Sequence, residues 1–415
     1  MSADGLAADL ESEQNRNGLS GLTMPSIRSN IPRIYAFKFL MSLHFIGGVL
    51  IPFFTDWGGI RFFQVMVLQA FFVFSIFLLE VPTGAVADHL GRKVSLILAA
   101  VMNGIAVLVY ASTPSFSVFL VGEFLWATSF ALASGADEAL LYDSLKQMNE
   151  EGHSKKVLAR FRSFEASAFM VAAPVGSAIA SFVGLRQTML FMSVPFLLAF
   201  LLAFTFEEPA CDGRRESRGY LETLTGGLRY FREHRVLRIL AFDMISISTL
   251  AFFIIWTYQP YLKEVGISLV YFGFVHAGLT GIQIVVMNNF GRLEKILGSR
   301  KGYLVWSALI PGGAFILLGV IPNAALTVPL LLVIAGFALS RRVLFDNYMN
   351  KHIESSVRAT VISTVSMIAT LVMGLMYLAV GLLVEWSLRG TLIAIGAAIL
   401  VCALLARTRE AYLVD

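Results

Sequence analysis

Long apolar runs recur along this chain from residue 34 to residue 406, and short polar stretches separate them. A helix needs about 20 mainly apolar residues to cross the hydrocarbon core of a bilayer. Helices are favoured there because lipid offers the backbone no hydrogen-bond partners. The sequence therefore predicts an all-α integral membrane protein with twelve spans, near residues 34–54, 62–83, 94–112, 116–142, 164–183, 187–206, 236–262, 269–290, 303–321, 326–346, 359–384 and 389–406.

The composition agrees with this class and argues against several others. Of 415 residues, 57% are hydrophobic and 14% are charged, whereas about a quarter are charged in a soluble domain. The net charge of +4 is spread over short loops, so no nucleic-acid partner is expected. Cys211, Cys402 and six scattered histidines indicate neither a disulfide framework nor a metal site. No nucleotide-binding loop or hydrolase motif is present, so we expect no cofactor and no enzyme activity.

The distribution of basic residues predicts the orientation. Of 32 Lys and Arg residues, only Arg61, Arg186, Lys263 and Arg389 fall in the odd-numbered connections. Lys and Arg concentrate in cytoplasmic loops, so the even-numbered connections and both termini are expected in the cytoplasm. The polar N-terminal tail lacks the basic start and cleavage site of a signal peptide and is expected to be disordered.

The connection at residues 207–235 divides the chain into two halves. It begins with the charged stretch Cys211–Glu216 and continues with Leu221, Leu224, Leu228 and Phe231. Their spacing predicts an amphipathic helix on the membrane surface, and a partner-binding helix is the alternative. The predicted domains are a tail (1–33), a six-helix bundle (34–206), the linker (207–235), a second six-helix bundle (236–407) and a tail (408–415).

A polar motif, Gly84 to Lys93, joins the second and third spans. Its two glycines permit a hinge with a sharp turn, Arg92 and Lys93 indicate the cytoplasmic side, and Asp88 stands where a carboxylate can cap a helix. A diverged copy, Gly291 to Lys301, follows the eighth span 207 residues later, with Lys295 in place of Asp88. The two copies predict pseudo-symmetric halves with a site between them. Chance similarity of two basic, glycine-rich loops is the alternative.

The pattern G-x-x-x-D-x-x-G-R-K, the twelve spans and the long middle connection resemble the major facilitator superfamily over about residues 34–407. The resemblance implies a secondary transporter whose two bundles rock around a central site. It implies a gating role for Gly84, Asp88, Gly91, Arg92 and Lys93, with Asp88 capping the eleventh helix when the cytoplasmic side closes.

Two further stretches bear on this resemblance. Residues 172–177 loosely resemble the Gly and Pro motif of family exporters, and a simple proline kink is the alternative. Glu123 stands about where family members commonly carry an arginine in the fourth span, so the role of that arginine cannot be transferred.

Ionisable residues within spans are candidate sites because their burial is costly. Glu123, Glu80 and His44 lie deepest and are the predicted proton-coupling residues. Trp126, Trp256 and Tyr258 are predicted to line an apolar substrate cavity.

Two charged pairs occupy matching positions in the fourth and tenth spans. Asp137 and Glu138 align with Arg341 and Arg342 after a shift of about 203–204 residues. We hypothesise a charge latch, in which these pairs meet when the bundles close on the cytoplasmic side. The alternative is that each pair is satisfied within its own bundle, for instance by Asp346.

The expected function is proton-coupled export of small amphipathic compounds by alternating access. The expected partners are a small-molecule substrate, protons and the lipid bilayer, and the expected setting is the inner (plasma) membrane, as a monomer. The alternatives are uptake of a polar metabolite by proton symport and a non-transporting receptor of the same fold.

Overall fold

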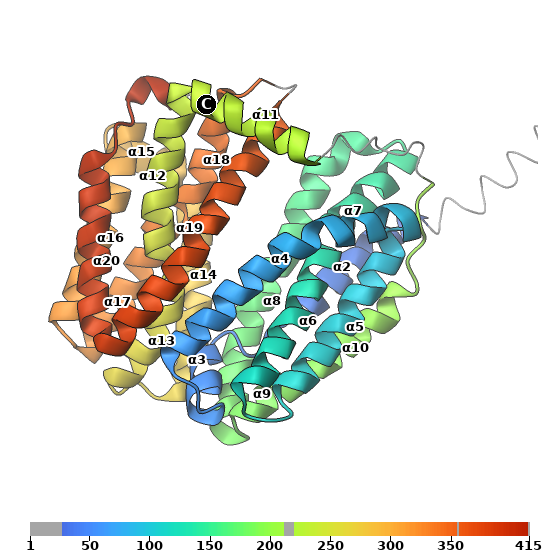
Figure 1. The fold of residues 1–415 in the computed structure, drawn as a ribbon, viewed down its shortest axis with the longest axis horizontal. Helices are drawn as coiled ribbons and strands as arrows, with labels where there is room; N and C mark the ends of the chain where they lie inside the picture. Colours follow the sequence, from blue (N-terminus) through green and yellow to red (C-terminus); the bar gives the residue numbers. More distant parts are fainter. Residues whose placement is uncertain (1–26, 211–219, 355–356, 414–415) are drawn as a thin grey trace, which may run out of the picture.

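The structure is a computed structural model that describes residues 27–210, 220–354 and 357–413. It consists of two groups of helices that lean together at one end and diverge at the other (Figure 1). The first bundle contains α2 (Asn30–Met41), α3 (Leu50–Pro52), η1 (Phe53–Trp57), α4 (Phe62–Leu90), α5 (Arg92–Tyr110), α6 (Phe116–Ala133), α7 (Ala136–Gln147), η2 (Glu151–His153), α8 (Ser154–Phe182), α9 (Leu185–Phe191) and α10 (Ser193–Ala203).

The second bundle follows α11 (Tyr220–Glu233), which crosses the helix ends in Figure 1. It contains α12 (Arg235–Phe252), α13 (Ile254–Glu264), η3 (Leu269–Tyr271), α14 (Phe272–Asn288), α15 (Phe290–Ile296), α16 (Arg300–Val320), α17 (Ala324–Ile334), η4 (Ala335–Leu339), α18 (Arg341–Lys351), α19 (Arg358–Trp386), α20 (Leu388–Leu405) and η5 (Glu410–Tyr412). We call the end of the molecule that carries α11 the linker face, and the end that carries η1 the opposite face.

Eleven helices of the described chain are long and apolar enough to cross a membrane. The first predicted span, 34–54, is not among them because it is broken. Its helix α2 begins at Asn30 and ends at Met41, and regular helix resumes only at Leu50. The break brings Gly48 against the second bundle, where a Cβ atom would lie 2.7 Å from the Cα atom of Gly273. The continuous helix expected here is therefore replaced by a close approach of two backbones.

Other spans are also interrupted, although the sequence suggested continuous helices. The fourth span breaks between α6 and α7, where Gly135 has a φ of +79°, which favours glycine. The seventh divides into α12 and α13, and the tenth contains the π-helix η4. Such interruptions leave backbone groups to be satisfied by neighbouring helices.

The predicted hinge at Gly84 to Lys93 is mostly helical. The helix α4 continues to Leu90, and Gly91 alone forms the turn, with a φ of +96°. The next helix is capped by Glu208, whose carboxylate accepts hydrogen bonds from the backbone N–H groups of Arg92 and Lys93, each at 2.7 Å. Asp88 does not perform this task.

The second half repeats this cap. Gly298 has a φ of +87°, and Glu410 accepts from the N–H groups of Arg300 at 3.2 Å and Lys301 at 2.8 Å. The weak sequence repeat therefore corresponds to a repeated structural element. Both capping carboxylates come from the chain just after the last helix of their own bundle.

The linker contains the predicted helix as α11, which packs against α19. The approach is close, because a Cβ atom at Gly227 would lie 2.2 Å from the Thr364 hydroxyl oxygen. The charged stretch Cys211–Glu216 lies outside the described residues.

Buried apolar side chains of the described chain form three clusters. Two lie near the linker face, one in each bundle, and the third joins both bundles in the half near the opposite face. Between the bundles, α4 packs on α19 and α8 packs on α14. The bundles are thus closed together at the opposite face and separate towards the linker face.

Gly176 on α8 gives a direct test of the packing of the broken first span within the first bundle, because a Cβ atom there would lie 1.6 Å from the carbonyl oxygen of Phe45. We expect Gly176→Ala to destabilise the protein by about 1–3 kcal/mol, the usual cost of overpacking, and to lower its melting temperature in detergent. The control is Gly104→Ala, since nothing lies within 4 Å of a Cβ atom at that helical position. Equal melting temperatures for the two variants would contradict the packing described here.

Candidate functional site

A cavity of about 460 Å³ lies between the two bundles. The second bundle provides nearly all of its wall, and Val73 of α4 is the contribution of the first. Apolar side chains alternate with a few polar groups, and Arg342 is the one charged residue in the wall. The lining residues are Val73, Met244, Ile245, Ser248, Thr249, Phe252, Ile255, Gln283, Leu339, Arg342, Ala369, Thr370 and Met373.

Two polar residues of this wall, Ser248 and Arg342, are not engaged by a hydrogen-bonding or ion-pairing partner within the described chain. The buried hydroxyl oxygen of Ser248 has no hydrogen-bond partner among the described residues, and an unmet buried hydroxyl is costly. The Arg342 side chain is exposed, and no ion pair within 4 Å engages it in the described part of the chain. The cavity can therefore hold a partly apolar molecule and offer it hydrogen bonds.

The three aromatic residues predicted to line a cavity do not border this one. Trp126 packs inside the first bundle, with its ring 5.9 Å from that of Tyr110 and 5.2 Å from that of His44. Trp256 and Tyr258 are buried in the core shared by the bundles. Phe252 and Ile255, on the same broken seventh span, face the cavity instead.

The buried carboxyl group of Glu123 is 4% exposed. It accepts a hydrogen bond from the Gln69 side-chain amide at 3.0 Å, and the Tyr110 ring lies against the preceding Gly122. No cation of the described chain pairs with it. A carboxyl group held only by neutral partners can gain or lose a proton without breaking an ion pair. The sequence pointed to Glu123 but not to Gln69, although an amide within an apolar run was a usable signal.

The other two proton-coupling candidates differ from Glu123. Glu80 is exposed and lies two helical turns from Val73 on the same face of α4, so it points to the space between the bundles. His44 lies in the break of the first span, and its Nε2 atom is 3.0 Å from the carbonyl oxygen of Met41. The Trp126 and Phe169 rings surround it. The three candidates therefore do not form one cluster.

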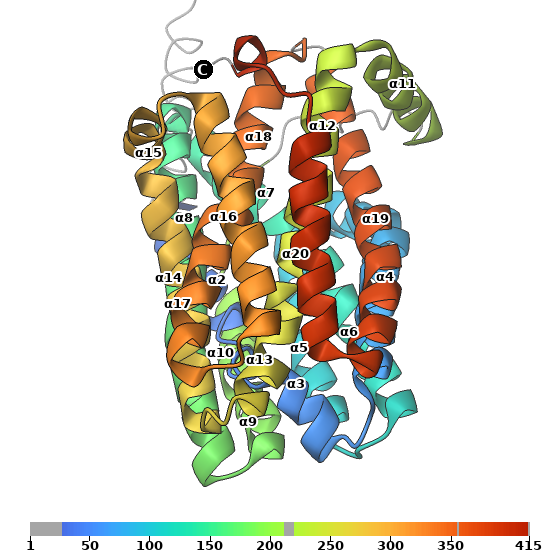
Figure 2. The same ribbon diagram turned by 90° about the vertical axis from the view of Figure 1, so that its left-hand side faces the viewer.

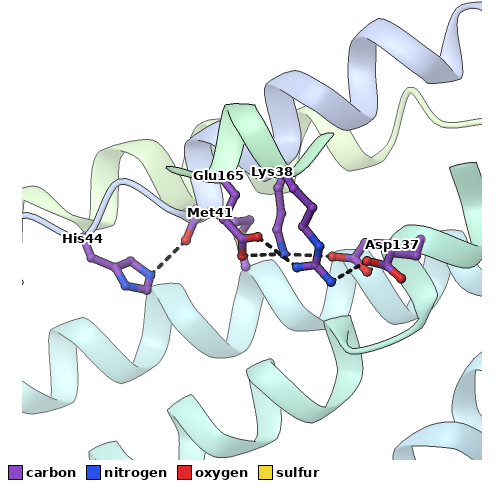
Figure 3. Close-up of polar contacts among 7 residues, drawn as sticks. Lys38, Met41, His44, Asp137 and Glu165 are labelled. Atoms are coloured by element: carbon purple, nitrogen blue, oxygen red, sulfur yellow. Dashed lines mark hydrogen bonds and ion pairs between the residues drawn. The ribbon is translucent and has the colours of Figure 1, made fainter. Parts of the chain in front are cut away.

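The first bundle contains a charge network on three helices, drawn in Figure 3. Lys38 of α2 lies 3.0 Å from Asp137 of α7 and 3.1 Å from Glu165 of α8. Arg162 extends the network, with ion pairs to Glu165 at 2.9 Å and to Glu138. Both acidic residues of the predicted latch are therefore paired within their own bundle.

The second bundle contains an ion pair that is more deeply buried than the network of the first bundle. Arg341 and Asp243 are 1% and 3% exposed, and their charged atoms lie 2.6 Å apart. Arg341 also donates to the Ser307 hydroxyl at 2.5 Å and to the Leu304 carbonyl oxygen. The second oxygen of Asp243 accepts from the Thr408 hydroxyl at 2.8 Å. Arg341 is thus a structural residue of the bundle interior, paired with Asp243 rather than Asp346.

These two pairs occupy equivalent places with opposite signs. In the first half the cation, Lys38, is on the first span and the anion, Asp137, is on the fourth. In the second half the anion, Asp243, is on the seventh span and the cation, Arg341, is on the tenth. Each pair ties the first helix of its repeat to the fourth.

The remaining gating candidates lie at the linker face. Arg92 forms an ion pair with Asp143, while Gly84 and Asp88 are exposed on α4. No hydrogen bond or ion pair within the described ranges engages the Asp88 side chain. The bundles diverge at this face (Figure 1), and the contacts expected of Asp88 and of the latch stay predictions for a state in which this face is closed.

The opposite face is closed by an amide that the sequence analysis did not single out. Gln259 accepts from the N–H group of Ile51 at 2.8 Å and donates to the carbonyl oxygen of Gly47 at 3.0 Å. It also donates to the Tyr258 hydroxyl, which lies 2.9 Å from Nδ1 of His276. An ion pair between Asp56 and Lys263, at 2.8 Å, lies at the rim. This closure joins the broken first span to the broken seventh span.

No metal-binding group of three acidic, His or Cys side chains is found in the described chain.

The two equivalent ion pairs should differ in their contribution to stability. Asp243→Asn would leave a buried guanidinium without its counter-charge, and we expect a loss of about 3–5 kcal/mol in the free energy of unfolding. Asp137→Asn should cost less, because Lys38 retains Glu165 at 3.1 Å. Thermal and chemical unfolding of the two purified variants gives the comparison, and equal losses would contradict the different burial of the pairs.

Comparisons with known proteins were made for sequence and for fold. A family model described as the Major Facilitator Superfamily matches residues 34–341. No curated protein sequence matches the chain.

Several solved structures are similar in fold. The nucleoside transporter NupG has a TM-score of 0.76 at 12% identity, covering 91% of this chain and 98% of its own. A bacterial homologue of the human lysosomal transporter Spinster, inward-facing and occupied, has a TM-score of 0.71 at 15% identity, covering 95% and 98%. A D-xylose–proton symporter has a TM-score of 0.67 at 15% identity, covering 94% and 98%. At these identities the likeness concerns the fold. The family model matches most of the chain, and the eleven long helices together with the broken first span make up the two bundles. The chain therefore belongs to the Major Facilitator Superfamily of multi-pass membrane transporters.

Proposed function

We propose that this transporter exports small, amphipathic compounds across the plasma (inner) membrane in exchange for protons. The observation that carries the proposal is the cavity between the bundles, whose wall combines apolar side chains with Ser248, Gln283 and Arg342. With a volume of about 460 Å³, it lies within the range of small-molecule sites.

The proposed orientation places the linker face in the cytoplasm. The concentration of Lys and Arg in the connections at this face supports it. The state described is then inward-facing, with the opposite face closed by Gln259 and the separated bundles leading to the cytoplasm. A cytoplasmic solute would bind in the cavity, and closure of the linker face would follow.

Coupling to protons is assigned to Glu123. Its carboxyl group is buried with neutral partners, and it lies in the first bundle close to the helices that meet α19. A group that alternates between a protonated and a charged form as access changes can link the two movements. Glu80 and His44 are secondary candidates.

Uptake of a polar solute by proton symport is the second candidate function. The hydroxyl and amide groups in the cavity wall favour it, and the structural neighbours include a nucleoside transporter and a D-xylose–proton symporter. Everted membrane vesicles with an imposed pH gradient, acid inside, distinguish the two functions. Accumulation of a fluorescent amphipathic compound supports export, whereas proton-driven uptake of a polar solute only into right-side-out vesicles or cells supports symport.

Glu123→Gln should abolish gradient-driven accumulation, because glutamine cannot carry the proton, while substrate binding in detergent should persist. The matched control is Glu233→Gln, the same chemical change at an exposed position on α11. Normal accumulation with normal pH dependence in Glu123→Gln would make Glu123 a structural residue, and Glu80→Gln would be examined in the same assay.

The gating proposal concerns the closed state of the linker face, in which Glu138 would meet Arg342 and Asp88 would cap α19. Glu138→Arg is expected to shift the population towards the state in which the linker face is open. Adding Arg342→Glu should restore much of the closed population. A change of about 1.4 kcal/mol in the free-energy difference between the two states changes their ratio tenfold. Asp88→Asn should weaken the closed state by about 0.3–2 kcal/mol. Spin-label distances across the linker face measure the populations, and strict additivity in the double-mutant cycle argues against the latch.

A further inference from the structure

A second cavity, of about 280 Å³, lies at the linker-face end of the second bundle. The ends of α12 and α16 and the chain after α20 enclose it, and Figure 2 shows the red C-terminal segment crossing there. Among the described residues, four cationic side chains line it, Arg235, Lys301, Arg407 and Arg409, and no acidic side chain does. Since α16 and α20 lie at the edge of the bundle that faces away from the first bundle (Figure 1), this cavity is remote from the central one.

The C-terminal segment that carries two of these cations is held firmly. Thr408 is buried and donates to Asp243 at 2.8 Å, and Glu410 caps α16. The carbonyl oxygen of Leu413 accepts from Arg300 at 2.6 Å, and that of Tyr412 lies 2.7 Å from Nε2 of His352. Residues 408–413 are thus a docked part of the bundle rather than a free tail. Docking leaves Arg407 and Arg409 exposed on either side of Thr408.

These cationic side chains have no carboxylate partner in the described part of the chain. Within the described ranges, none of the four cations forms an ion pair within 4 Å. The nearby Glu410 is engaged by two backbone N–H groups, and Asp243 is engaged by Arg341 and Thr408. Among its described lining residues the cavity therefore presents only positive charge.

The repeat indicates that the fold does not require Arg407 and Arg409. An offset of 202 residues aligns the capping residues Glu208 and Glu410 and also aligns Arg33 with Arg235. At this offset, Thr205 and Glu207 stand where Arg407 and Arg409 stand. The same capping element is thus built in the first half without these two arginines.

We propose that this cavity binds the phosphate group of an anionic phospholipid. Clustered Arg and Lys side chains are suited to phosphate oxygens. The surface of α20 leading to the cavity is apolar and open, because Val401, Leu404 and Leu405 are 53%, 82% and 59% exposed. This strip provides a path for acyl chains directly below a charged headgroup, which a free phosphate compound would not use. The lipid lies in the leaflet at the linker face, so the proposal depends on membership of a membrane protein family but not on the transported substrate.

The test measures lipid binding to the purified full-length chain by native mass spectrometry. The probes are dioleoylphosphatidylglycerol, dioleoylphosphatidylcholine and glycerol 3-phosphate. We expect the anionic lipid to bind at least about tenfold more tightly than the zwitterionic lipid, and glycerol 3-phosphate to compete weakly. Arg407→Gln/Arg409→Gln should remove this preference, and Arg407→Lys/Arg409→Lys should largely retain it.

The control variant is Lys155→Gln/Lys156→Gln, which removes two exposed cations from α8 at the same face. An equal loss in the control, or no loss in the Arg407 and Arg409 variant at an unchanged melting temperature, would overturn the site in favour of a general surface charge effect. Full competition by glycerol 3-phosphate would overturn the lipid assignment in favour of a soluble phosphate ligand. Because the readout is binding, it stays separate from the outcome of the vesicle transport assay.

Discussion

A charge buried in an apolar surrounding must find its counter-charge nearby, and this constraint organises both bundles. Lys38 and Asp137 satisfy it in the first bundle, and Asp243 and Arg341 satisfy it in the second. Each pair joins the first helix of its repeat to the fourth, although the signs are reversed. Because the partners lie inside one bundle, the pairs hold each bundle together without holding the two bundles to each other.

The bundles are joined by different means. Glycine permits the close approach of Gly48 and Gly273 near the opposite face, and the Gln259 amide bridges the broken first and seventh spans. These contacts are neutral hydrogen bonds and apolar packing, and the ion pair between Asp56 and Lys263 lies at their rim. The buried ion pairs therefore lie within the bundles and not between them. Two such bundles are physically suited to rock against each other.

The second bundle links its core to its surface. Arg341 contacts Asp243, and Asp243 contacts Thr408, which lies between the two exposed arginines of the basic cavity. An anion bound in the basic cavity would therefore contact a segment that is hydrogen-bonded, through Thr408, to the buried ion pair of the bundle. The corresponding segment of the first bundle carries Thr205 and Glu207 in place of Arg407 and Arg409, so the two repeats share an architecture but differ in surface chemistry.

Sequence alone determined the family, the two halves, the helix in the linker and the number of spans, because these depend on hydropathy over about 20 residues and on the motif at Gly84 to Lys93. It also singled out Glu123, Asp137 and Arg341, since a charge in an apolar run is conspicuous.

Only the tertiary structure decided what these residues contact. Most spans are apolar all round, so their sequences do not show which face meets lipid, a neighbouring helix or the cavity. For this reason the aromatic residues expected in the cavity lie elsewhere, Glu208 caps α5 from a distant part of the chain, and the first span is broken. Contacts between segments far apart in the chain determine which charges pair and where helices are interrupted. A local sequence pattern does not predict these contacts.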